Sequence, residues 1–148
     1  MSSKMITMPL AVLAVISLAA VACHTPETRE QSLEGVDWEV RSIESKGTEY
    51  SPSALGRQPF LRFEAGQITG LTGVNRLFGS FTVTSTPARR HQLSFSGLGQ
   101  TRAGGPPEVM EFETLMMQSL EKVDEYRLDG KSLVLRFTGG KFTLAAGD

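Results

Sequence analysis

Residues 125–145 read EYRLDGKSLVLRFTGGKFTLA, and this stretch decides the fold. It contains three short runs in which apolar and polar residues alternate, at 125–128, 132–137 and 141–145. Alternation with a period of two predicts β-strands. The Asp129-Gly130 and Gly139-Gly140 pairs between the runs are strong signals for tight hairpins. The C-terminal part of the chain is therefore predicted to form three antiparallel strands.

The segment before these strands has a helical periodicity instead. Its apolar residues lie on one predicted helix face, at Val109, Phe112, Leu115, Met116, Leu120 and Val123. Pro106 and Pro107 suit a helix start, while glutamates in the first turns and Lys122 near the end complement the helix dipole. We predict one amphipathic helix over about 108–122, with its carboxylates on the surface. The Met116-Met117 pair is interpreted as core filler rather than as a pliable ligand surface.

Five more strands are predicted before the helix, and together they define the fold class. Alternating patterns place them at 37–43, 60–63, 67–70, 78–84 and 92–96. Gly70, Gly73 and Gly79 surround Asn75 and Arg76, so this region is predicted to be a tight, irregular loop. Many short strands joined by glycine turns favour a mainly β (α+β) domain. It should be an antiparallel curled sheet or barrel of about eight short strands, capped by the single helix.

The charge balance excludes one large class of partner. The 148 residues contain 15 basic and 16 acidic side chains, a net charge of −1. Such a balance argues against nucleic acid as a partner. The only local basic run, Arg89-Arg90-His91, is interpreted as a solvated loop tip, with weak contact to anionic lipid headgroups or lipopolysaccharide as the alternative.

The N-terminus has the pattern of a bacterial secretion signal. Lys4 is followed by an uncharged, mostly apolar stretch that ends in Ala20-Val21-Ala22-Cys23, after which the chain becomes polar. This ending resembles the lipobox of bacterial lipoproteins. That resemblance implies cleavage before Cys23 and lipid attachment to its thiol. We therefore predict a signal peptide over 1–22, a flexible tether over 23–32 and one domain over 33–146.

Two other interpretations of the N-terminus stay open. The apolar stretch could be a short transmembrane anchor, or cleavage could leave an unmodified thiol at Cys23. The thiol has no possible disulfide partner in the chain, because Cys23 is the only cysteine. Lipidation gives it a role and anchors the protein to a membrane. His24, in place of the aspartate that tends to retain lipoproteins in the inner membrane, predicts the outer membrane, facing the periplasm.

The order of elements resembles the META domain family, also called HslJ-like, of small bacterial envelope proteins. The similarity begins at Leu33-Glu34-Gly35-Val36-Asp37-Trp38, is centred on Gly73-Val74-Asn75-Arg76 and continues at Leu98-Gly99-Gln100-Thr101-Arg102-Ala103. Where the family commonly has two cysteines, this chain has Val74 and Gly105. If those cysteines form a disulfide in relatives, its loss costs on the order of 3 kcal/mol and should loosen the segment 100–107.

No constellation for catalysis is evident. His91 is the one histidine of the predicted domain and is expected in a loop, and neither a metal site nor a cofactor is predicted. Asn75, Arg76 and Thr101 are the candidate site. Asn75 can accept an unusual backbone and bond its neighbours, Thr101 can add a hydroxyl bond, and Arg76 can pair with an acidic residue. This structural interpretation is preferred to a recognition surface.

Two functions are compatible with these observations. The resemblance implies a membrane-tethered, non-catalytic interaction module of the cell envelope, with an envelope protein as partner and a role in envelope integrity or in stress and antibiotic tolerance. The alternative is a carrier of small hydrophobic ligands in the interior of the barrel. A carrier needs an interior that side chains do not already fill.

Overall fold

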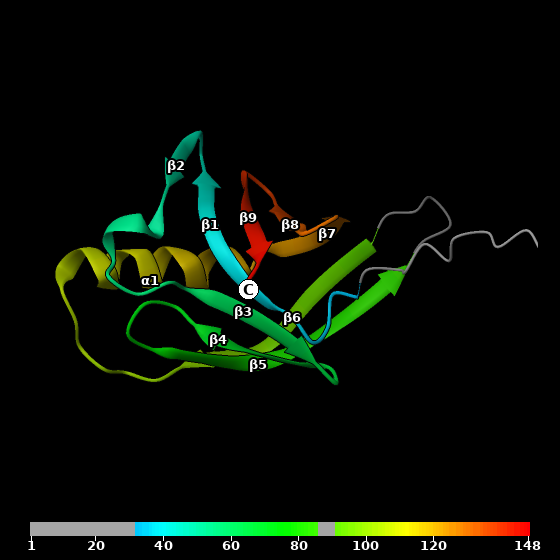
Figure 1. Cartoon of the computed structure of the whole chain (residues 1–148), viewed down its shortest axis with the longest axis horizontal. Coiled ribbons are helices and arrows are strands. Elements are labelled where there is room, and N and C mark those ends of the chain that lie inside the picture. The colour runs from blue at the N-terminus through cyan, green and yellow to red at the C-terminus, as the bar shows by residue number, and fades with distance from the viewer. Residues whose placement is uncertain (1–31, 86–90) are drawn as a thin grey trace, which may run out of the picture.

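The computed structural model describes residues 32–85 and 91–148, which form a closed antiparallel β-barrel with one α-helix (Figure 1). The strands of this part of the chain are β1 (Asp37–Ser45), β2 (Thr48–Tyr50), β3 (Phe60–Glu64), β4 (Gln67–Leu71), β5 (Arg76–Ser85), β6 (His91–Gln100), β7 (Val123–Asp129), β8 (Ser132–Phe137) and β9 (Gly140–Ala146). Strands β1 and β3 to β9 follow one another around the sheet, and pairing of β1 with β9 closes the ring. Strand β2 is a ninth strand outside it.

The predicted fold class is confirmed, with local corrections. All eight predicted strands are present, and the C-terminal hairpins turn where the glycine pairs predict. The three-residue strand β2 was not predicted, because it is too short to show a pattern. The irregular loop expected across the glycines is confined to residues 72–75, since Gly70 belongs to β4 and Gly79 to β5. His91 is not in a loop: it begins β6, and its ring stacks on Tyr126 with centroids 5.0 Å apart.

Strand β1 changes neighbours halfway along one edge. Residues 37–39 pair with β3 and residues 43–45 pair with β2. Between these two pairings, the backbone N–H of Val40 donates to the carbonyl of Pro59 at 2.9 Å, and Nε2 of Gln58 donates to the carbonyl of Val40 at 2.7 Å. These bonds satisfy the backbone N–H and carbonyl groups of Val40, where β1 has neither β2 nor β3 beside it. Strand β2 and the following 3₁₀ turn η1 (Pro52–Ala54) project from the barrel.

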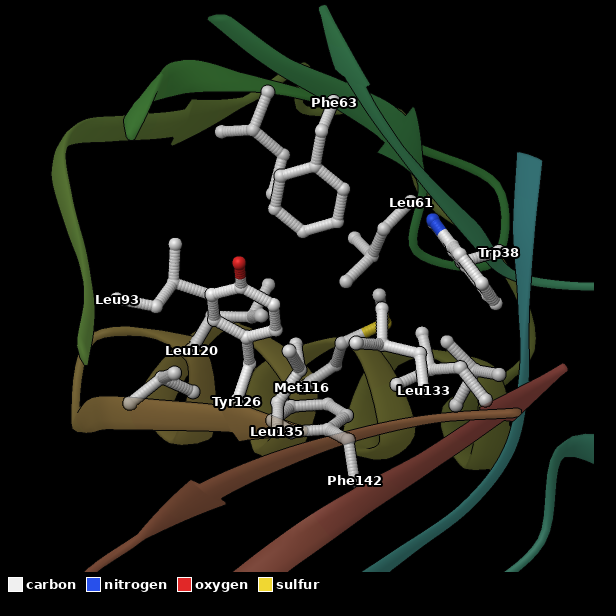
Figure 2. Close-up of a cluster of buried hydrophobic side chains, with 14 of the residues drawn as sticks. Trp38, Leu61, Phe63, Leu93, Met116, Leu120, Tyr126, Leu133, Leu135 and Phe142 are labelled. Atoms are coloured by element: carbon white, nitrogen blue, oxygen red, sulfur yellow. The ribbon is translucent and has the colours of Figure 1, made fainter. Parts of the chain in front are cut away.

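Helix α1 (Pro107–Leu120) covers one opening of the barrel (Figure 2). Its inward side chains, Phe112, Met116 and Leu120, join the apolar core that the strands contribute. Met116 is fully buried, which confirms that it is core filler. The helix ends before Lys122, so this lysine does not lie in its last turn as expected.

Several predicted features lie outside the described residues. These are the signal peptide over 1–22, Cys23, nearly all of the tether and the Arg89-Arg90 pair. In the described part of the chain, no helix has both the length and the apolar character needed to cross a bilayer.

Candidate functional site

A buried carboxylate on α1 forms the centre of the candidate site. The side chain of Glu113 is almost completely buried, since the residue is 2% exposed. Its Oε1 accepts the backbone N–H groups of Val74 at 2.7 Å and Asn75 at 2.8 Å, and the hydroxyl of Thr72 lies 3.0 Å away. Its Oε2 accepts Nδ2 of Asn75 at 2.7 Å. A carboxylate can be buried at tolerable cost only when it is hydrogen-bonded in this way.

The loop between β4 and β5 is shaped to receive this carboxylate. The consecutive N–H groups of Val74 and Asn75 point at one oxygen, as in the backbone concavities that bind anions. Gly73 allows the helix to approach, because a Cβ atom there would lie 2.7 Å from Cγ1 of Val109 and 3.1 Å from Glu113. Glu113 therefore occupies, from within the chain, the position where an external anion could bind.

Asn75 extends the bonded centre to the segment after β6. Its Oδ1 accepts the hydroxyl of Thr101 at 2.9 Å and the backbone N–H of Ala103 at 2.7 Å. Its Nδ2 also donates to the carbonyl of Ala103 at 3.0 Å. Arg76 and Thr101 are joined by two hydrogen bonds, both of 3.0 Å. The backbone N–H of Arg76 donates to Oγ1 of Thr101, and the backbone N–H of Thr101 donates to the carbonyl of Arg76. We call Thr72, Asn75, Thr101 and Glu113 the polar centre.

The polar centre joins three parts of the chain, and its members are hydrogen-bonded to one another or to nearby backbone groups. It links α1, the loop 72–75 and the segment 101–103, so that the helix is held over the barrel opening. In the described residues no buried side-chain nitrogen or oxygen lacks a hydrogen-bond partner. A ligand could reach the buried carboxylate of Glu113 only by displacing these internal hydrogen bonds. The geometry thus supports the structural interpretation of Asn75 and Thr101.

Arg76 differs from the other two candidate residues. Its backbone, at the start of β5, is hydrogen-bonded to Thr101, but its side chain is exposed. The expected ion pair with an acidic residue is absent among the described residues. Arg76 is therefore the one member of the three predicted residues whose side chain is free to meet a partner.

Glu113 was missed at the sequence level, because the carboxylates of this segment were predicted to lie on the helix surface. The sequence nevertheless contained a sign that Glu113 is buried. Glu113 follows Val109 by four residues and precedes Met116 by three, so it lies in the middle of the apolar stripe. A carboxylate at such a position is expected to have hydrogen-bond donors, and the loop with Asn75 supplies them.

The two positions that resemble the family's cysteine sites are neighbours. A Cβ atom at Gly105 would lie 3.2 Å from Cγ1 of Val74. In a disulfide, a Cβ atom lies about 3 Å from the opposite sulfur, given an S–S bond of roughly 2.05 Å. Val74 and Gly105 thus occupy positions that a cross-link could join. Asn75 holds Ala103 through two hydrogen bonds, and the expected loosening of the segment 100–107 stays a prediction.

A second feature lies on the other side of α1, between the helix and the projection made by β2 and η1. A cavity of about 560 Å³ there is lined by Glu49, Tyr50, Ser51, Ala54, Leu55, Glu108, Glu111, Phe112 and Leu115. The two elements lie side by side in Figure 1. We call this cavity the α1–β2 groove. None of its three glutamates has a basic partner within 4 Å among the described residues.

The described residues form a small antiparallel β-barrel that is closed at one end by a helix, which the buried carboxylate of Glu113 holds to the loop 72–75. The chain belongs to the META domain family, whose model matches residues 31–147. This confirms the resemblance inferred from the sequence.

Solved structures show the same fold at low sequence identity. An NMR structure of a protein from Burkholderia xenovorans has a TM-score of 0.64 and 22% identity over 78% of this chain and 83% of its own. A DUF4847 family protein from Bacteroides vulgatus has a TM-score of 0.52 and 15% identity over 76% of this chain and 93% of its own. No curated protein matches the chain significantly.

Proposed function

We propose that the protein is a lipid-anchored component of the bacterial cell envelope whose META domain is a non-catalytic interaction module. The observation that carries this proposal is the N-terminal sequence, in which an apolar stretch ends in Ala22-Cys23 and the cysteine is the only one in the chain. Three-chain acylation at that residue would anchor the protein stably, whereas a single acyl chain is marginal. His24 favours sorting to the outer membrane, with the domain facing the periplasm.

The polar centre supports a non-catalytic role. A catalytic group must be able to reach substrate, whereas the carboxylate of Glu113 is buried and accepts its hydrogen bonds from Thr72, Val74 and Asn75. The most organised polar group of the described residues is thus committed to holding the fold together. Exposed surfaces, rather than this centre, are available for a partner, and a role in envelope integrity or stress tolerance is compatible with such binding.

The packing of the barrel favours the module over the carrier of small hydrophobic ligands. Side chains from opposite strands and from α1 meet inside the ring (Figure 2). Trp38, Phe63, Phe142 and Met116 are among the largest of those that are almost fully buried. The groove between α1 and β2, in contrast, lies outside the barrel, where exposed residues of the helix such as Glu108 and Glu111 line it together with Phe112.

The anchor is tested by expressing the full chain in a bacterial host and analysing the membrane fraction by mass spectrometry. We expect the chain to begin at Cys23 and to carry a diacylglyceryl group on its sulfur and an acyl group on its amine. Cys23→Ala should prevent attachment of the lipid, and cleavage by the lipoprotein signal peptidase should be lost with it. His24→Asp is the matched control, since it should keep the lipid and change only the membrane in which the protein accumulates. An intact Met1 terminus, or an unmodified thiol at Cys23, would contradict the anchor.

A further inference from the structure

The α1–β2 groove combines an apolar lining with unpaired negative charge. Tyr50, Phe112 and Leu115 contribute apolar surface, and Tyr50 is 43% exposed. The cavity volume of about 560 Å³ lies within the range of roughly 300–1,000 Å³ that is typical of ligand pockets. An exposed aromatic ring beside such a cavity is the kind of surface that partners use.

The charges of the groove lie on both of its walls and have one sign. Glu49 comes from β2, whereas Glu108 and Glu111 come from the first turns of α1. Among the residues that the structure describes, no basic residue lines the groove. The N-terminal end of the helix offsets part of the charge of Glu108, which lies in the first turn. The field of the other two carboxylates is not compensated by any ion pair in the described part of the chain.

Within the described residues, β2 has one strand partner only. All three residues of β2 are exposed, and in this part of the chain its sheet pairing is with β1 alone. An edge strand with a free side can add an extended peptide through main-chain hydrogen bonds. The projection therefore presents a strand edge, an apolar surface and carboxylates at one place.

We infer that the α1–β2 groove docks a cationic, amphipathic peptide segment of an envelope protein. An apolar side chain of the segment packs against Phe112 and Leu115, and flanking lysines or arginines pair with Glu49 on one wall and Glu111 on the other. The inference deepens the proposed interaction module by naming its surface and the chemistry of its partner. Charge complementarity selects a cationic segment, because an anionic one would face three like charges.

The test measures the affinity of a peptide for the mature protein, which begins at Cys23, held in nanodiscs of phosphatidylcholine. Empty nanodiscs are the blank. The probe is a dansyl-labelled pentapeptide, KLKFK, whose fluorescence anisotropy reports binding. Two control peptides separate the contributions: ELEFE reverses the charge and KSKSK removes the apolar side chains. We expect KLKFK to bind more tightly than both, and its affinity to fall as the salt concentration rises.

Matched variants locate the binding surface. Glu49→Gln with Glu111→Gln should raise the Kd for KLKFK about fivefold, as expected for the loss of two exposed ion pairs. Glu121→Gln with Asp124→Asn removes the same charge from exposed positions outside the groove and should change the Kd less than about twofold. Thermal unfolding of each double variant checks that the fold is retained.

Several results would overturn the inference. These are equal binding of ELEFE, an unchanged Kd for the groove variant, or an equal loss in the control variant. Two other occupants have their own signatures. A dimer that dissociates when KLKFK binds would assign the groove to a second copy, and a Kd lowered about tenfold by deletion of residues 25–31 would assign it to the chain's own N-terminal segment. Lipidation is scored separately by mass spectrometry, so failure of the anchor is distinguishable from failure of the groove.

Discussion

Glu111 and Glu113 lie two residues apart on the same helix and have opposite environments. Glu113 is buried and accepts hydrogen bonds from the loop 72–75. Glu111 is exposed, lines the α1–β2 groove and has no basic partner among the described residues. Two positions on a helix are separated by about 200° around its axis, so the two carboxylates point to different sides.

The difference shows how one residue type acquires two roles in one segment. On the inner side, the protein supplies every donor that the carboxylate needs, and Glu113 holds α1 over the barrel. On the outer side, no described basic residue pairs with Glu111, which is therefore available to a cation from elsewhere. Charge on a helix therefore contributes to stability or to binding according to the donors around it.

The largest effect is expected from truncation of the inner carboxylate. Glu113→Ala should lower the free energy of unfolding by about 3 to 5 kcal/mol, because it leaves the buried donors of Val74 and Asn75 without an acceptor. Glu111→Ala should change it by less than about 0.5 kcal/mol, as is usual for an exposed side chain. Urea denaturation followed by circular dichroism measures both.

Glu113→Gln controls for the shape of the side chain. It keeps one acceptor oxygen but turns an amide toward the donors of Asn75, so an intermediate loss is expected. Equal losses in the free energy of unfolding for Glu111→Ala and Glu113→Ala would contradict the assignment of different roles to the two sides of the helix.

A smaller change, of opposite sign, is expected from a cross-link beside the polar centre. In a Cys23→Ser background, Val74→Cys with Gly105→Cys should form a disulfide, because the two positions are in contact. Closing this loop of 31 residues (105 minus 74) should raise the free energy of unfolding by about 3.7 kcal/mol. Denaturation with and without a reducing agent measures the gain.

The cross-link also sharpens the role of Glu113. If the disulfide and the polar centre secure the same loop, Glu113→Ala should cost less in the oxidised double-cysteine protein than in its reduced form. Equal costs would mean that the two devices act independently. Failure of the thiols to pair would show that Val74 and Gly105 are not positioned as described.

Much of the fold could be predicted because its signals are local. The alternation in β8 and the glycine pairs beside it specify hairpins from a few neighbouring residues. Closure of the barrel could not be decided in this way, and a curled sheet remained an alternative. The barrel is closed by pairing of β1 with β9, which joins residues near the two ends of the domain, such as Trp38 and Ala146. No local sequence pattern indicates that two such distant strands pair.

The candidate site was predicted in part for the same reason. Thr101 was expected to add a hydroxyl bond to the region of Asn75 and Arg76, and its hydroxyl donates to Oδ1 of Asn75 at 2.9 Å. Glu113 was missed because its charge was given more weight than its place on the apolar stripe. The groove had no sequence signal, because it exists only where the short strand β2 comes beside α1.

The smallest effect is expected at Arg76, which tests whether recognition and structure divide between neighbouring residues, Asn75 and Arg76, as they do along the helix. Its backbone bonds to Thr101 are available to any residue except proline, whereas its side chain is exposed. Arg76→Ala should therefore change the free energy of unfolding by less than about 0.5 kcal/mol.

Thr101→Val is the matched comparison for Arg76→Ala. It removes the hydroxyl that donates to Asn75 and accepts from the Arg76 backbone, so a loss of about 1 to 2 kcal/mol is expected. Urea denaturation of the two variants side by side gives the answer. A loss above about 1 kcal/mol for Arg76→Ala would place its side chain in the structural centre. None of the three candidate residues would then remain for recognition, and the α1–β2 groove would be the stronger candidate surface.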